Sequence, residues 1–211
     1  MQIRIHLLVF MLLTGNFSVF AQSGQGGDSL LNLPGDGLDL YAMLDLFQQS
    51  KTIEEFEKSL NSEKSGVNNL DLNLDGKVDF IKVETKQKDD DFTFILKVDV
   101  KEKETQDVAV ILLTKDDDKT MNMQAVGDEE LYGKDFVVEL EKSSKPAVTA
   151  NPGYQGDEPP VESEPATTTV VVVEQTPIVK YVYSPAYVPY YPPYYWGYYP
   201  PYWGFGFAAI S

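Results

Sequence analysis

The spacing of apolar residues changes once along this chain, near residue 78, and this change determines the class of fold. Upstream of it, apolar side chains recur every three or four residues, which is typical of amphipathic helices. Downstream of it, they alternate with polar side chains, which is typical of strands with one buried face. A run of helices followed by a run of strands predicts an α+β fold.

Two helices are predicted, over residues 38–49 and 52–60. Their apolar faces consist of Leu40, Met43, Leu44 and Phe47 in the first helix, and of Ile53, Phe56 and Leu60 in the second. Asp36 or Asp39 is expected to cap the first helix. Thr52, with a glutamate three residues later, matches a capping box for the second helix.

About five strands are predicted after the helices. They cover residues 79–84, 92–100, 108–113, a stretch that begins at residue 121, and residues 136–140. The third is apolar on both faces and is expected in the middle of the sheet. Short acidic turns join the strands, which predicts antiparallel pairing. We therefore expect two N-terminal helices packed on an antiparallel meander of about five strands, followed by a disordered tail rich in Pro and Tyr.

Composition divides the chain further. The expected parts are a signal peptide (1–21), a flexible lead-in (22–37), the α+β domain (38–142), a linker rich in Pro, Thr and Glu (143–180), and a low-complexity tail rich in Tyr, Pro and Trp (181–211). Toward the end of the linker and into the tail, residues 170–173 and 178–183 can form strands if another part of the protein covers them. Because the strand pattern ends at Leu140, the domain is expected to fold without the residues after Lys145.

The first 21 residues have the pattern of a cleavable export signal. A short, positively charged start precedes an apolar run over residues 7–20, which is shorter than the roughly 20 residues that a membrane span needs. Cleavage is expected between Ala21 and Gln22; an uncleaved anchor is the alternative. No cysteine follows the apolar run, which excludes a lipoprotein anchor. The protein is expected in the periplasm, at the cell surface or secreted, with no transmembrane helix after cleavage.

Cleavage at this position changes which chemistry the protein can perform. His6 and Arg4 are the only residues of their kind, both lie in the signal, and the chain has no cysteine. The mature chain therefore lacks the histidine and cysteine that Ser-His-Asp sites, Cys-His sites and His- or Cys-based zinc sites need. Because Arg4 is one of 17 basic residues, 16 lysines remain against 33 acidic residues, a formal charge of −17. This charge repels nucleic acid. We expect no enzyme; the alternative is a carboxylate-based secreted hydrolase acting on glycans.

One short loop has the composition of a calcium site. The candidate ligands are Asp71, Asn73, Asp75 and Asp79 through their side chains, and Lys77 through its carbonyl oxygen. Oxygen ligands at alternate positions surround a single point, and Gly76 permits the sharp turn between them. Calcium is the expected cofactor. The alternative is an ordinary Asp-Gly hairpin turn.

The pattern D-x-N-x-D-G-x-x-D over residues 71–79 resembles the calcium loops of VCBS and FG-GAP repeats. That resemblance implies a calcium ion with a structural role, held by the ligands named above. The chain differs from those loops at Leu74, where they usually have glycine. The wider stretch over residues 40–140 resembles a group of uncharacterised exported bacterial proteins of the Bacteroidota type, which implies no known activity.

The tail is the second lead to function. Ten tyrosines, both tryptophans and six prolines lie between Tyr181 and Trp203. The rings can stack on sugars, lie at a membrane interface, or fold back on the domain or on another copy; a disordered tail is the alternative. An envelope glycan or protein is the expected partner of the tail between Tyr181 and Phe207. The expected function is an exported non-catalytic domain, stabilised by one calcium ion, whose aromatic tail contacts the envelope or cell surface.

Overall fold

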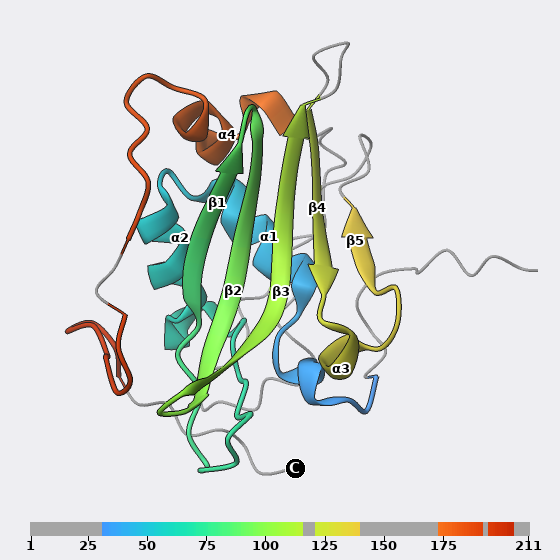
Figure 1. Ribbon diagram of the computed structural model, residues 1–211, viewed down its shortest axis with the longest axis vertical. Helices are drawn as coiled ribbons and strands as arrows, with labels where there is room; N and C mark the ends of the chain where they lie inside the picture. The colour runs from blue at the N-terminus through green and yellow to red at the C-terminus, as the bar shows by residue number, and fades with distance from the viewer. Residues whose placement is uncertain (1–30, 116–120, 140–172, 192–193, 205–211) are drawn as a thin grey trace, which may run out of the picture.

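The computed structural model describes residues 31–115, 121–139, 173–191 and 194–204. Within them, five antiparallel strands form one sheet in the order β1-β2-β3-β4-β5, and the helices α1 and α2 lie behind it (Figure 1). The prediction of an α+β fold with helices preceding an antiparallel meander is confirmed. The predicted signal peptide, most of the lead-in and residues 143–172 of the predicted linker lie outside the described residues.

The elements follow one another in a simple order. The helices before the sheet are η1 (Pro34–Gly37), α1 (Leu40–Gln49), α2 (Ile53–Leu60) and η2 (Glu63–Ser65). The strands are β1 (Lys82–Lys88), β2 (Asp91–Lys101), β3 (Glu104–Lys115), β4 (Met121–Gly127) and β5 (Val137–Glu139), with α3 (Glu129–Tyr132) between the last two. Two further helices follow, η3 (Val173–Gln175) and α4 (Pro177–Val182).

Side-chain caps explain where the first two helices begin. Asp39 Oδ1 accepts hydrogen bonds from the Tyr41 and Ala42 N–H groups, at 2.8 and 3.2 Å, and so caps α1. Thr52 Oγ1 accepts from the Glu55 N–H at 3.1 Å and caps α2. Each cap satisfies backbone donors that have no partner inside the helix. Of the two aspartates predicted as caps of the first helix, Asp39 has that role.

The core lies between the sheet and the helices. Phe47 of α1 contacts Phe56 of α2 and Phe94 of β2, with ring centroids 5.0 and 4.8 Å apart. All three rings are fully buried. β3 is the middle strand, as its apolar sequence predicts, and its Ile111 lies opposite Phe94 in the register.

The helix α4 is the main difference from the predicted structure. Residues 178–183 were predicted to form a strand if covered, but Pro177 to Val182 form a helix that packs on α1. Pro177 occupies the first turn, where its missing N–H is no loss. Four aliphatic side chains of η3 and α4 belong to the core: Val173, Ile178, Val179 and Val182. The core therefore extends beyond residue 142.

After α4, the described parts of the tail contain turns but no helix or strand. This agrees with its many prolines, which remove backbone donors and fix φ. The tail nevertheless lies against the domain, on the β1 side of the sheet (Figure 1). Folding back on the domain is thus the arrangement that the structure describes for residues 183–191 and 194–204.

Candidate functional site

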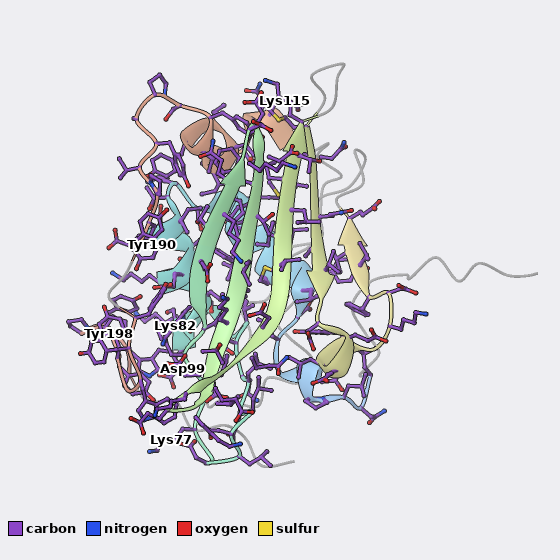
Figure 2. The ribbon with its side chains drawn as sticks, in the orientation of Figure 1. Lys77, Lys82, Asp99, Lys115, Tyr190 and Tyr198 are labelled. Carbon is purple, nitrogen blue, oxygen red and sulfur yellow. The ribbon has the colours of Figure 1, made fainter. Side chains whose placement is uncertain are left out.

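The predicted calcium loop lies at one end of the molecule, where Figure 2 shows Lys77, while Lys115 marks the opposite end. The Asp71 carboxylate accepts hydrogen bonds from the Asp75 and Gly76 N–H groups, at 3.0 and 2.9 Å. Asn73 Oδ1 also accepts from the Asp75 N–H, at 2.9 Å. Asp75 Oδ1 in turn accepts from the Lys77 N–H, at 2.9 Å. These bonds curl the backbone around its own acidic side chains.

Asp79 closes the loop. Its side chain is buried, with 7% exposed. Its two carboxylate oxygens accept hydrogen bonds from the Leu72 N–H at 2.6 Å and from Asn73 Nδ2 at 3.0 Å. Burial, with a contribution from the charges of Asp71 and Asp75, raises the pKa of Asp79 to about 6. The structure thus brings together all four residues predicted to bind calcium through their side chains.

The backbone of the loop is strained at one position. Gly76 has φ of 81°, which suits glycine, but Leu74 also has a positive φ, 60°. This left-handed region is sterically unfavourable for leucine because of its Cβ atom. Leu74 is 86% exposed. Leu74 is the position at which the sequence differs from the repeats that the loop resembles.

The donors of the loop fit a hard cation, because calcium prefers carboxylate and amide oxygens. Among the residues that the structure describes, no group of three or more His, Cys, Asp or Glu side chains is arranged to hold a metal ion as it stands. The carboxylates instead accept hydrogen bonds from N–H groups. Calcium binding therefore requires the side chains of Asp71, Asp75 and Asp79 to turn toward one point. The carbonyl of Lys77 remains a predicted ligand.

Two buried asparagines attach this loop to the core, and sequence reasoning missed both. Asn61 Nδ2 donates to the Ile81 carbonyl at 2.7 Å, and Asn61 Oδ1 accepts from the Ile81 N–H at 2.8 Å. Asn68 Nδ2 donates to the Asp79 carbonyl at 2.9 Å. The predicted strand over residues 79–84 consequently enters the sheet only at Lys82, because side chains satisfy the backbone before it.

A buried carboxylate in α2 holds the tail in place. Glu57 is 1% exposed. It accepts hydrogen bonds from the Tyr190 hydroxyl at 3.0 Å, from the Tyr194 hydroxyl, and from the Val83 N–H at 2.9 Å. Burial raises the pKa of Glu57, and the hydrogen bonds from Tyr194 and Val83 oppose that rise. Burial and the nearby Glu57 charge also raise the pKa of Tyr194.

Other tail rings pack on the sheet and beside the loop. Tyr183 and Tyr187 both contact Phe92 edge to face, with centroids 5.3 and 5.6 Å apart. Trp203 contacts Phe80, the residue after Asp79, at 5.2 Å. The tail therefore spans the domain from the β1–β2 turn to the calcium loop.

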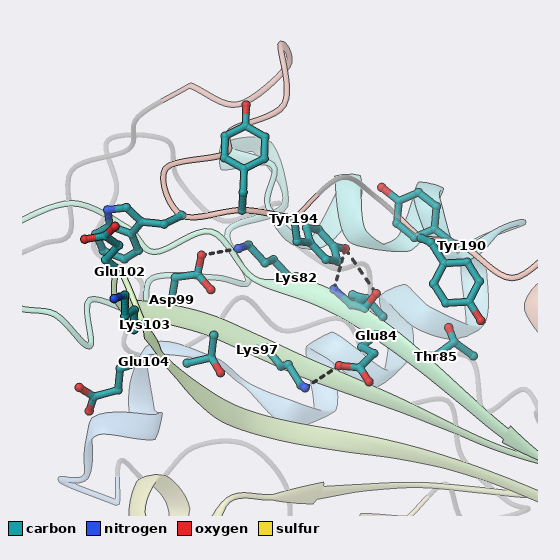
Figure 3. A pocket seen from close by; sticks show the side chains of 15 residues that line it. Lys82, Glu84, Thr85, Lys97, Asp99, Glu102, Lys103, Glu104, Tyr190 and Tyr194 are labelled. Atoms are coloured by element: carbon teal, nitrogen blue, oxygen red, sulfur yellow. Dashed lines mark hydrogen bonds and ion pairs between the residues drawn. The ribbon is translucent and has the colours of Figure 1, made fainter.

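Tail and sheet line a cavity of about 600 Å³ that is open to solvent on one side (Figure 3). One wall carries the rings of Tyr190, Tyr191, Tyr194, Tyr195 and Trp196. The other wall carries charged side chains from β1, β2 and the β2–β3 turn. Two ion pairs order that second wall: Lys82 with Asp99, and Lys97 Nζ with Glu84 Oε2 at 2.5 Å. The Lys97 ammonium holds the pKa of Glu84 below its ordinary value.

The chain shows no match among protein-family models, curated proteins or solved structures. Within its described part, no helix is long and apolar enough to cross a membrane. Function is therefore inferred from the loop, the tail and the cavity. The tail composition indicated the aromatic wall, but no sequence signal paired it with Glu57, which lies more than 130 positions earlier.

Proposed function

We propose that the protein is an exported, non-catalytic binding domain that one calcium ion stabilises and that contacts the cell envelope through its tail. One observation carries this proposal: the tail is fixed to the domain by hydrogen bonds to the buried Glu57, yet several of its rings face solvent. Tyr191 is 75% exposed, Tyr195 64% and Trp196 47%. All three line the same cavity.

The fixed positions of these exposed rings favour a role in binding a partner over a role in packing alone. The Glu57 bonds fix Tyr190 and Tyr194, so their exposed neighbours are held in place before any partner arrives. A partner then loses less conformational entropy on binding than it would with a flexible tail. Large apolar groups kept in water and grouped together are typical of interaction sites.

The charges in the cavity support binding rather than hydrolysis. A glycosidase needs one carboxyl with a raised pKa as general acid. In the cavity, the pKa of Glu84 is shifted the opposite way, and Asp99 is paired with Lys82. Glu57 has a raised pKa but lies beneath Tyr190 and Tyr194, outside the cavity lining.

Calcium is expected to stabilise the exported chain, residues 22–211, at neutral pH. At 100 times its dissociation constant, an ion that binds only the native state adds about 2.7 kcal/mol. For a chain of this length that raises the melting temperature by about 5–10 °C. Thermal melts with EDTA and with millimolar calcium measure the shift. Asp75→Ala is expected to abolish it, and Asp90→Ala, in the acidic β1–β2 turn, to leave it unchanged.

The rise in melting temperature caused by calcium should be smaller at acidic pH. This pH dependence tests the role of Asp79. Because the folded pKa of Asp79 is raised from 3.8 to about 6, its proton stabilises the calcium-free protein at low pH, and this stabilisation is lost as the pH rises through 6. Calcium needs the ionised carboxylate, so its effect should be larger at pH 7.5 than at pH 5. An equal shift in Asp75→Ala would refute the assigned site.

Envelope contact is expected to depend on the cavity rings. The exported chain should sediment with isolated bacterial envelopes, and Trp196→Ala should reduce the bound fraction severalfold because it removes a ring from the cavity wall. Tyr202→Ala is the matched control. This tail ring is 39% exposed and lies outside the cavity lining, with Lys58 Nζ 5.2 Å from its centroid. Sedimentation that is absent, or equal in all three proteins, would contradict the proposal.

A further inference from the structure

The cavity has a volume that is usual for a small-molecule site. Its volume of about 600 Å³ falls within the range of about 300–1,000 Å³ that is usual for ligand pockets. Its two walls come from parts of the chain that lie about 100 residues apart, the tail and the first two strands. Figure 3 shows the tail crossing above the charged side chains of the sheet.

The two walls differ in chemistry. Tyr191, Tyr195 and Trp196 offer flat rings with apolar faces. The opposite wall offers the ammonium groups and carboxylates of the Lys82–Asp99 and Lys97–Glu84 pairs, which can donate and accept further hydrogen bonds. A ligand that fits both walls has an apolar face on one side and dense hydrogen-bonding groups around its edge.

The charges of the lining nearly balance. Its charged residues are Lys82, Lys97 and Lys103 against Glu84, Asp99, Glu102 and Glu104. Two of the three lysines are already paired with carboxylates of the same wall. The cavity therefore offers no cationic cluster for a phosphate or a carboxylate, and this balance favours an uncharged ligand.

We propose that this cavity binds a neutral sugar chain. Each sugar ring has C–H faces that pack on Tyr191, Tyr195 or Trp196, and hydroxyls at its edge for the paired lysines and the carboxylates. The inference rests on the proposed function and names the ligand class of the same rings. The chain belongs either to an envelope polymer or to a free oligosaccharide.

Titration calorimetry on the exported chain tests this with four neutral tetrasaccharides: β-1,4-glucose, α-1,4-glucose, β-1,4-N-acetylglucosamine and β-1,4-xylose. At least one should bind saturably, and Trp196→Ala should weaken it by about tenfold, which corresponds to about 1.4 kcal/mol for the lost ring contact. Trp196→Phe should restore most of the affinity, and Tyr202→Ala should leave it unchanged. Competition of the bound tetrasaccharide against envelope sedimentation identifies the polymer as the source; its absence identifies the free oligosaccharide.

No binding by any of the four neutral probes, or tighter binding of tetragalacturonate, would overturn the inference. If no neutral sugar bound but the envelopes still bound the protein in a Trp196-dependent way, the proposed function would hold and only the sugar inference would fail. If the envelopes did not bind it, the proposed function would fail as well.

Discussion

A chain that ends at Lys145 is expected to lose its cooperative thermal transition. This truncation removes the four aliphatic side chains that η3 and α4 contribute to the core: Val173, Ile178, Val179 and Val182. Burial of each is worth about 1.5–3 kcal/mol, an upper value because unfolded chains are partly compact. Together they amount to about 6–12 kcal/mol, as much as the whole stability of a typical domain. Melts of residues 22–145 and 22–211, followed by circular dichroism, make the comparison.

Two further proteins sharpen this test. A chain that ends at Gly204 keeps every contact described above and should melt like the full exported chain. Ile178→Ala in the full chain should cost about 2–5 kcal/mol, because Ile178 is fully buried against the core. A cooperative transition of residues 22–145 at the temperature of the full chain would show that the tail is not part of the core, as the strand pattern alone predicts.

Replacing Asn61 by leucine is expected to destabilise the domain by about 2–6 kcal/mol. Asn61 forms hydrogen bonds with both the N–H and the carbonyl group of Ile81, and Ile81 is fully buried. Leucine has a similar volume, so it leaves both backbone groups buried without partners, at about 1–3 kcal/mol each. Urea denaturation at constant calcium measures the change.

The control for Asn61→Leu is Gln87→Leu. Gln87 is an exposed amide in β1 whose Nε2 donates only to the nearby Asp89 carbonyl, at 3.0 Å. Its replacement should change the free energy of unfolding by no more than about 0.5 kcal/mol. Equal effects of the two substitutions would mean that the amide bonds to Ile81 contribute nothing beyond a surface contact.

The elements that the sequence predicted well are those whose partners are local. Thr52 and Asp39 cap helices through bonds to residues two or three positions away. In β2, apolar and polar residues alternate because successive side chains of a strand point to opposite faces of the sheet. That pattern is visible without knowing any distant partner. The loop residues from Asp71 to Asp79 lie within one turn of chain, so their spacing alone placed them side by side.

The elements that it missed depend on distant partners. The valine-rich run before α4 has high strand propensity, and only the spacing of Ile178, Val179 and Val182, with Pro177 in front, fits a helix. From the sequence, Glu57 is expected to be a solvent-exposed residue of α2, because no residue near it in the sequence indicates the two tyrosines that cover it. The cavity follows from those same contacts, so no local pattern could reveal it.

The position of Tyr194 has a consequence for self-association. β1 is an outer strand, and the Tyr194 hydroxyl, which donates its proton to Glu57, covers both backbone groups of Val83. Its oxygen accepts from the Val83 N–H at 3.1 Å and lies 3.3 Å from the Val83 carbonyl oxygen. A side chain thereby occupies backbone groups onto which another molecule could add a strand. The tail is synthesised after the sheet. A newly made chain thus has an open sheet edge until the tail reaches it, so the tyrosine that helps to hold the tail also covers an edge that is otherwise open to pairing with another strand.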